Sequence, residues 1–132
     1  MNSILILLVM IFLHIVADYN LQGILASMKQ IGYWETSFIK QGMSIDDFHK
    51  SMYNKDYLMA LFMHSFAWTF LFMLPLMIVF NFSFLYIVTF IVNIVLHMYI
   101  DDLKANRLKI NLVQDQLLHL LQIVVTWTLF FV

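Results

Sequence analysis

Four long apolar stretches take up most of this 132-residue chain. A helix needs about 20 largely apolar residues to cross the hydrocarbon core of a bilayer. Four windows reach that length, at about residues 3–22, 57–80, 82–101 and 112–132. The hydrophobic share of 63%, the charged share of 11% and a mean hydropathy of +0.86 exclude an ordinary soluble globular protein. We therefore expect an all-α integral membrane protein, a bundle of four transmembrane helices that forms a single membrane domain over residues 1–132.

The basic residues predict how these spans are oriented. Lys29, Lys40, Lys50 and Lys55 lie between the first and second stretches, and Lys104, Arg107 and Lys109 lie between the third and fourth. Four spans bring both segments to the same side, and the positive-inside rule makes that side cytoplasmic. We expect both termini outside and a location in the inner membrane of a bacterium, or of a phage-infected host. The expected partners are membrane lipids and not nucleic acid, and a bundle this small is compatible with a homo-oligomer.

The one long segment outside the spans, residues 23–56, mixes aromatic and charged side chains. That mixture is typical of a segment at the level of the lipid headgroups. Ser44 and Asp47 have the spacing of a capping box and predict a short helix toward Met52. We expect a short interfacial helical segment on the cytoplasmic side. It acts either as a simple connector or as a lid over the cytoplasmic mouth.

Histidine and aspartate recur four residues apart inside the apolar stretches. The pairs are His14 with Asp18, His97 with Asp101 and, in reverse order, Asp115 with His119, while His64 stands alone in the second stretch. Residues at i and i+4 share one face of a helix. An Asp at mid-membrane costs about 2.5–3.5 kcal/mol on insertion scales. Seven such groups therefore need a compensating partner.

The depth of these residues predicts one common site. At about 1.5 Å of rise per residue, all seven fall within roughly 10–12 Å of the cytoplasmic surface. Antiparallel helices of a bundle would direct them to a shared axis. Imidazole and carboxylate suit zinc best here, with manganese or iron as alternatives, and seven groups are enough for one or two ions. The absence of cysteine excludes thiolate zinc sites and iron–sulfur clusters.

Roles within that site follow from residue type. We expect His14, His64, His97 and His119 to be metal ligands. Asp18, Asp101 and Asp115 are expected to be ligands or bridging carboxylates, with one of them as an alternative general base in catalysis. Gln22, Asn93, Lys104 and Gln116 fall on the same faces and are expected to orient ligands or bind substrate. Lys104 either binds a substrate phosphate or carboxylate, or extends to the interface as a lipid-facing lysine. A proton path and a structural hydrogen-bond network remain alternatives for the whole cluster.

The order of these motifs resembles an uncharacterised family of small bacterial and phage integral membrane proteins. The shared pattern is His14-x-x-x-Asp18-Tyr-x-Leu-Gln22, a mid-chain His64, His97-x-x-x-Asp101-x-x-Lys104 and Asp115-Gln116-x-x-His119. The chain is also similar, more weakly, to membrane-bound proteins described as metal-dependent hydrolases, which carry His and Asp in short hydrophobic spans. The resemblance implies a polar site at these positions and supports no particular reaction.

These observations favour a metal-dependent hydrolase that acts on a lipid, or a lipid-linked ester or phosphoester, at the cytoplasmic leaflet. A bound metal ion would polarise the scissile bond and lower the pKa of a water molecule. Three alternatives remain open. They are a divalent metal or proton transporter or channel, a protein that binds haem through two histidines, and a small phage-style membrane effector that acts by assembly.

Overall fold

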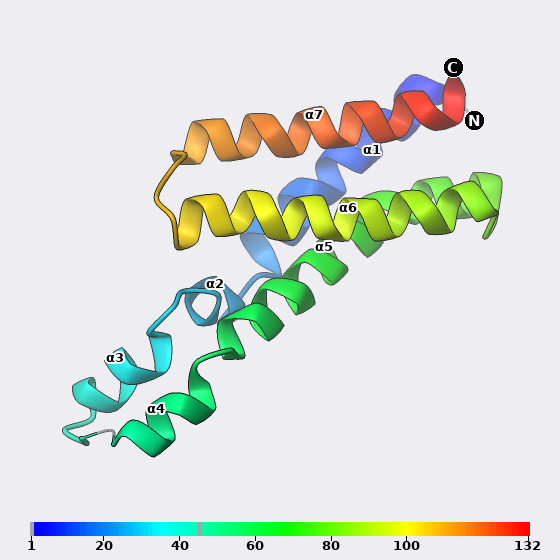
Figure 1. The fold of residues 1–132 in the computed structure, drawn as a ribbon. Helices are drawn as coiled ribbons and strands as arrows, with labels where there is room; N and C mark the ends of the chain where they lie inside the picture. Colours follow the sequence, from blue (N-terminus) through cyan, green and yellow to red (C-terminus); the bar gives the residue numbers. More distant parts are fainter. Residues whose placement is uncertain (1, 45) are drawn as a thin grey trace.

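The computed structural model describes residues 2–44 and 46–132, and every regular element in these ranges is a helix. The elements are α1 (Ser3–Ile15), η1 (Val16–Asn20), α2 (Leu25–Met28), α3 (Tyr33–Lys40), α4 (Asp47–Tyr53), α5 (Asp56–Phe80), α6 (Phe84–Ala105) and α7 (Leu112–Phe131). The element η1 is a π-helical turn that continues α1 (Figure 1). The expected all-α class is therefore confirmed.

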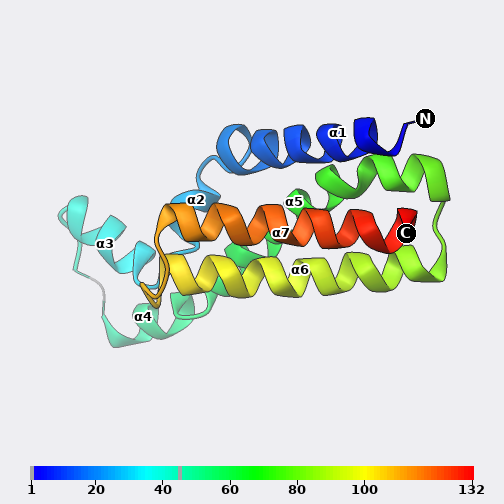
Figure 2. The same ribbon diagram turned by 90° about the horizontal axis from the view of Figure 1, so that it is seen from above.

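The long helices α1, α5, α6 and α7 pack side by side as a helical bundle (Figure 2). Helix α5 lies between α1 and α6, and α7 contacts both α6 and α1, so the four enclose a shared interior. The two termini and the α5–α6 turn lie at one end, and α2, α3, α4 and the α6–α7 loop lie at the other. Both basic segments are consequently at the same end of the bundle.

Three stretches of the described residues are long and apolar enough to cross a membrane: Ser3–Asn20, Asp47–Phe80 and Phe84–Ala105. The fourth expected span coincides with α7, which has 20 residues but is less apolar. Its hydropathy is lowered by polar side chains, of which Asp115, His119 and Gln122 are buried in the bundle. Large apolar residues such as Leu117 and Leu121 form its exposed face.

Local signals explain where the helices begin. Asn111 caps α7 in a capping box with Gln114, in which each side chain accepts a hydrogen bond from the other residue's backbone N–H. Helix α4 confirms the short helix expected before Met52, but the expected box from Ser44 is wrong. Asp46 is the cap, because its Oδ1 accepts from the backbone N–H of His49 at 2.8 Å. That bond, together with one from the His49 ring, holds the pKa of Asp46 below its ordinary value.

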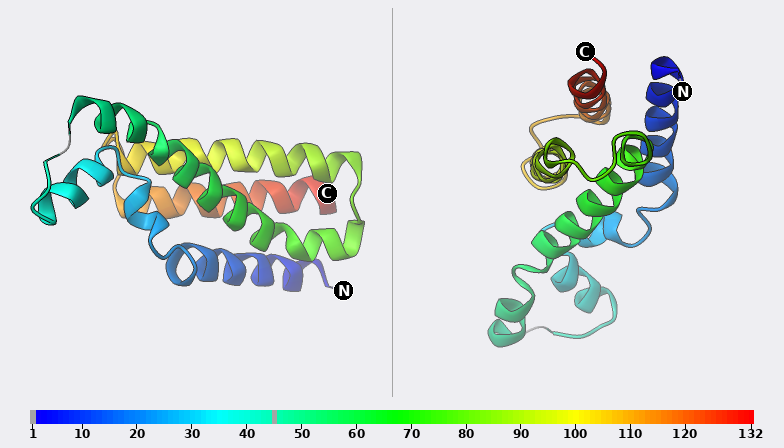
Figure 3. Two further views of the ribbon diagram at one scale, coloured as in Figure 1. Left: turned by 90° about the horizontal axis from the view of Figure 1, so that it is seen from below. Right: turned by 90° about the vertical axis from the view of Figure 1, so that its right-hand side faces the viewer.

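The interior divides into two zones along the bundle. Toward the end that carries the termini, it is an apolar core built from Ile6, Met10, Phe72, Met73, Leu76 and Ile123. Pro75 lies within α5, which bends in its last third without being interrupted (Figure 3). A proline bends a helix because it removes one backbone hydrogen bond. Toward the other end, the interior is polar and holds the histidines and aspartates.

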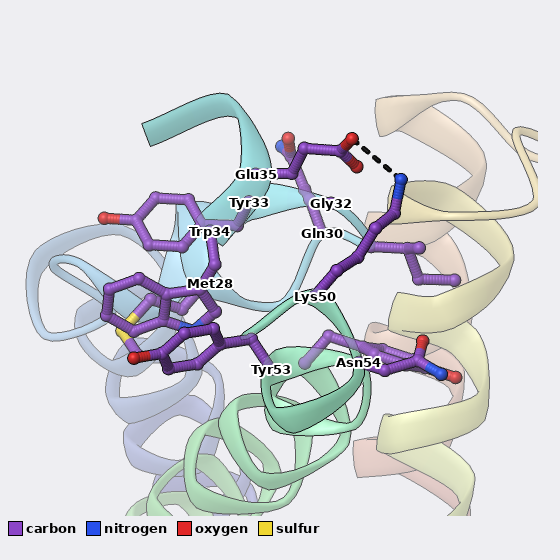
Figure 4. A pocket seen from close by; sticks show the side chains of 11 residues that line it. Met28, Gln30, Gly32, Tyr33, Trp34, Glu35, Lys50, Tyr53 and Asn54 are labelled. Carbon is purple, nitrogen blue, oxygen red and sulfur yellow. Dashed lines mark hydrogen bonds and ion pairs between the residues drawn. The ribbon is translucent and has the colours of Figure 1, made fainter. Parts of the chain in front are cut away.

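The described residues of the segment 23–56 fold as three short helices, α2, α3 and α4, beside a shallow cleft. The ring of Trp34 packs against Tyr53 with centroids 5.3 Å apart. Glu35 and Lys50 form an ion pair at 2.8 Å, drawn as the dashed line in Figure 4. The cleft between them has a volume of about 90 Å³. The segment attaches to the bundle where Asn106, just after α6, hydrogen-bonds the backbone of Lys29 and Ile31.

Candidate metal centre

The seven predicted residues come together in the interior from four different parts of the chain. This His–Asp cluster consists of His14 from α1, Asp18 from η1, His64 from α5, His97 and Asp101 from α6, and Asp115 and His119 from α7. All the histidines and the two aspartates of α6 and α7 are buried, and the Asp18 side chain is 8% exposed. The predicted convergence of the cluster is confirmed.

Asp101 lies at the middle of the cluster. Its Oδ1 is 3.4 Å from His119 Nε2, and its Oδ2 is 3.4 Å from His64 Nε2 and 3.8 Å from His97 Nε2. The other two aspartates flank this group. Asp18 Oδ1 lies 3.4 Å from His64 Nε2. On the opposite side, Asp115 Oδ1 lies 3.4 Å from His119 Nε2.

Two overlapping sets within the cluster have the spacing of metal ligands. They are Asp18–His64–His97 and His97–Asp101–His119, and in each set one donor atom per residue lies within 4.8 Å of the others. His97 belongs to both sets. The cluster can therefore surround one ion or two adjacent ions.

Two lysines hold the outer oxygens of two aspartates. Lys29 Nζ donates to Asp101 Oδ2 at 2.6 Å, and Lys104 Nζ donates to Asp115 Oδ2 at 2.5 Å. The second oxygen of each carboxylate, Oδ1, is buried and has no hydrogen-bond partner among the described residues. Each aspartate is thus fixed from outside and directs a free oxygen toward the histidines.

Gln116 is the centre of a chain of directed hydrogen bonds. The Trp68 indole N–H donates to His14 Nδ1 at 2.7 Å, so the proton of this ring lies on Nε2. His14 Nε2 then donates to Gln116 Oε1 at 3.1 Å. The amide group of Gln116 donates to Asp18 Oδ2 at 2.7 Å and to Asp115 Oδ2 at 3.1 Å. Both ring nitrogens of His14 are engaged, and this residue supports the two carboxylates through Gln116.

The π-helical turn explains why His14 and Asp18 do not pair directly. The i, i+4 geometry expected from their spacing holds for an α-helix. Asp18 lies instead within η1, where Leu21 N–H bonds to the Val16 carbonyl five residues back at 3.1 Å. The wider turn changes the direction of Asp18 and lets Gln116 stand between the two. Such π-turns are frequent at functional sites.

His97 and His119 are the least satisfied groups in the interior. Both are fully buried, and none of their four ring nitrogens has a hydrogen-bond partner within the described part of the chain. Leaving a polar group buried without a partner costs about 1–3 kcal/mol. The rings are held by stacking, with centroids 4.1 Å apart for Trp68 and His97 and 4.2 Å apart for His97 and His119. A cation between these nitrogens and the free carboxylate oxygens would satisfy both kinds of group.

The net charge of the cluster also favours a bound cation. Asp18, Asp101 and Asp115 contribute three negative charges, and Lys29 and Lys104 contribute two positive ones. One negative charge is left over when the histidines are neutral. An uncompensated buried charge is strongly unfavourable, so the cluster favours a cation.

The four predicted supporting residues divide into two groups. Gln22 Nε2 lies 3.2 Å from His64 Nε2, and Lys104 and Gln116 hold aspartates as described. Asn93 supports no member of the cluster, because its Nδ2 donates to Thr126 Oγ1 at 3.0 Å and its Oδ1 accepts from Gln122 Nε2 at 2.8 Å. This second network is centred on Asn93, which precedes His97 by one turn of α6 and so lies nearer the end of the bundle that carries the termini.

Sequence reasoning missed Lys29 and Trp68. The positive-inside rule uses Lys29 only as a cytoplasmic charge. Three buried aspartates beside the single lysine Lys104 nevertheless indicate that a second positive group is needed. Trp68 follows His64 by four residues, so the i, i+4 rule used for the pairs would have placed it on the same face. Comparison of the chain with family models, curated proteins and solved structures gives no match. The function therefore has to be argued from the site itself.

Proposed function

We propose that this chain is a membrane-embedded metalloprotein that uses the His–Asp cluster to bind one or two transition-metal ions, with zinc favoured over manganese or iron. The observation that carries the proposal is the set of buried, unpaired donor atoms on His97, His119, Asp101 and Asp115. Nitrogen and carboxylate oxygen are the donors that these metals take in proteins. Facing helices of bundles commonly build such centres.

The inner ligands are His64, His97 and His119 together with the facing oxygens of Asp18, Asp101 and Asp115. Six donors exceed the four of one tetrahedral zinc, which favours two ions. Asp101 would help to hold both, since its Oδ1 lies near His119 and its Oδ2 lies near His64. His14 acts behind this shell through Gln116. Partners of this kind fix the orientation of ligands and commonly matter 10- to 100-fold for metal affinity.

The catalytic role that this centre fits best is hydrolysis of a lipid, or a lipid-linked ester or phosphoester, at the cytoplasmic leaflet. A bound metal ion supplies polarisation of the scissile bond and a water of lowered pKa. If Asp115 is not needed as a ligand, it would be placed to hold a proton there, because its Oδ1 has no partner among the described residues and its Oδ2 is held by Lys104, the more exposed of the two lysines. Lys104 is 30% exposed and can bind an anionic group arriving from the headgroup layer.

The membrane placement rests on four spans, with α7 as the fourth. The polar residues that lower its hydropathy face the interior, so its outer face suits lipid. The basic segments put the cluster near the cytoplasmic leaflet. Because the chain contains no cysteine, single-cysteine variants at Lys50 and at Val132 test this directly. Labelling of whole cells by an impermeant thiol reagent should reach position 132 and not position 50.

The apolar core disfavours a transporter or channel. Beyond the cluster, Met10, Phe72 and Leu76 fill the interior, each with no measurable exposure. A path for an ion would need polar groups or water through that zone. The stacked rings likewise disfavour haem, since His97 lies against both Trp68 and His119. A porphyrin would need an open slot between two histidines.

Elemental analysis of the purified protein tests metal binding. We expect one or two equivalents of a transition metal in the wild type and a loss of at least half of it in His97→Ala and in His119→Ala. The matched control is His49→Ala, because His49 is an exposed histidine on α4 outside the cluster. Wild-type protein without stoichiometric metal, or equal metal in all four proteins, would refute the proposal.

Hydrolysis is tested separately. Phospholipids with a fluorogenic ester or phosphoester, presented in mixed micelles, should be cleaved by metal-loaded protein. Cleavage should stop with a chelator and fall at least 10²-fold in Asp115→Asn. Stoichiometric metal without turnover on any of these substrates would leave the metal centre in place and exclude the hydrolase role for them.

A further inference from the structure

An apolar groove runs along the outside of the bundle between α6 and α7. It has a volume of about 510 Å³, within the range of small-molecule sites. Its walls are mostly leucines and valines on the two helices, from Leu85 and Leu129 at one end to Ile100 and Leu118 at the other, and the buried polar residues Thr89, Asn93, Gln122 and Thr126 form its floor. At about 1.5 Å of rise per residue, the 15 residues from Leu85 to Ile100 span roughly 22 Å.

The groove has different chemistry at its two ends. One helical turn beyond Ile100 lies Lys104, and one turn before Leu118 lies Asp115; their ion pair closes the gap between the helices there. Lys104 is 30% exposed, and an ammonium group has three donors, of which Asp115 takes one. The other two donors have no partner among the described residues, and Lys104 lies at the end of the groove nearest the His–Asp cluster. The Leu85 end has only apolar and hydroxyl-bearing residues along the groove.

The dimensions of the groove favour a narrow chain over a helix, which could lie across its mouth but could not enter it. A helix about 10 Å across and 22 Å long occupies roughly 1,700 Å³, several times the volume available. A narrow, flexible and apolar chain fits. A single positive group at one end adds a preference for a negatively charged terminus, since opposite charges attract more strongly where water is scarce.

We propose that the α6–α7 groove binds one acyl chain of an anionic lipid, with the headgroup at Lys104. The inference deepens the proposed function and rests on it, because it supplies the position of the lipid substrate. Asp101 follows Ile100 and His119 follows Leu118 directly in sequence. A chain that lies in the groove therefore brings its ester or phosphate to the level of the metal centre. The groove is roughly 22 Å long, and the hydrocarbon of one leaflet is only about 15 Å deep. The groove is therefore long enough for an acyl chain.

Photo-crosslinking tests the site. Purified protein in nanodiscs receives a trace of phosphatidylglycerol with a diazirine on one acyl chain, and the labelled peptides are identified by mass spectrometry. We expect labelling of α6 and α7 groove residues at least fivefold above that of exposed residues on other helices, such as Leu8 and Phe62. A diazirine-labelled free fatty acid serves as a second arm and shows whether the headgroup beyond the anion matters.

A pair of tryptophan variants sharpens the result. Val92 lines the groove, and Val95, on the same helix, is exposed but does not. Val92→Trp should lower groove labelling at least fivefold, and Val95→Trp should leave it unchanged. Lys104→Gln should weaken binding of the anionic lipid about tenfold and leave phosphatidylcholine unaffected. Uniform labelling of all exposed helix faces, equal effects of the two tryptophans, or cross-links between protein copies along this face would each overturn the inference.

The outcome is separable from failure of the metal proposal. Metal content is measured in every variant, and the labelling is repeated with His97→Ala. Groove labelling of wild-type protein that holds no stoichiometric metal would support the lipid site and refute the metal centre. Full metal content with uniform labelling would do the reverse.

Discussion

Replacement of Lys29 by methionine should be among the most damaging single changes in this protein. Lys29 follows α2 directly, is 5% exposed, and places its Nζ 2.6 Å from Asp101 Oδ2. Methionine keeps the length and the apolar stem of the side chain but removes the ammonium group. The Asp101 carboxylate, 1% exposed, then stays buried without this partner.

The size of the effect follows from the burial of both groups. Breaking a buried ion pair by removing one partner costs about 3–5 kcal/mol, because the remaining charge is left uncompensated. That is a factor of roughly 10² to 10⁴ in the unfolding equilibrium constant. The double variant Lys29→Met with Asp101→Asn removes both charges. It should recover most of that free energy, and it should lose metal if Asp101 is an inner ligand as proposed.

Unfolding of the purified protein in mixed micelles with increasing SDS, followed by tryptophan fluorescence, measures the free energy of unfolding. The matched control is Lys50→Met, which breaks an ion pair of similar length with Glu35 at an exposed position. Exposed pairs contribute little to stability, so this variant should unfold close to the wild type. The measurement is made with the metal removed by a chelator in all samples, so that binding does not add to stability.

Equal stability of Lys29→Met and Lys50→Met would refute this reasoning. So would a double variant that is no more stable than Lys29→Met alone, since the cost would then come from lost packing and not from an unpaired charge. Either result would mean that Lys29 does not neutralise Asp101 in the interior.

Two further changes probe the hydrogen-bond chain behind the ligands. Gln116→Leu removes the amide donor to Asp18 Oδ2 and leaves Lys104 as the donor to Asp115 Oδ2. It should weaken metal binding about 10- to 100-fold without abolishing it; competition with a chromophoric chelator measures this, and unchanged affinity would contradict the positioning role. Trp68→Phe keeps an aromatic ring beside His97 but removes the donor to His14, and should cost about 1–3 kcal/mol of unfolding free energy because a buried acceptor loses its partner. A loss well under 1 kcal/mol in the same SDS titration would show that this bond adds little.

The arrangement of helices and the convergence of the cluster could be predicted from sequence because both depend on period and depth. The i, i+4 spacing holds within α6 and α7, where His97 with Asp101 and Asp115 with His119 lie on regular helix. The charge distribution correctly placed both basic segments at one end of the bundle. Each of these inferences uses only position along the chain.

The remaining features depend on geometry that spacing does not encode. Lys29 directly follows the short helix α2. Its position beside α6 is fixed by Asn106, which donates a hydrogen bond to its backbone carbonyl. The π-turn at Asp18 breaks the regular spacing on which the His14 prediction relied. Asn93 has the right face and the wrong depth, because one turn of α6 is enough to move it from the cluster to the network with Gln122. The i, i+4 spacing predicts which face of a helix a residue lies on, but it does not predict which residue of another element that side chain contacts.

The polar residues of α7 bear on how a four-span protein of the proposed kind would enter the membrane. Asp115 meets Lys104 on α6, and Gln116 meets His14 on α1, which are both synthesised earlier. The polar groups of α7 make its burial in an apolar environment costly. The free energy of burying them falls only when those partners are present. In the four-span arrangement proposed above, integration of the last helix would be coupled to tertiary packing, and Lys104→Gln should lower the fraction of chains whose C-terminus crosses the bilayer during synthesis.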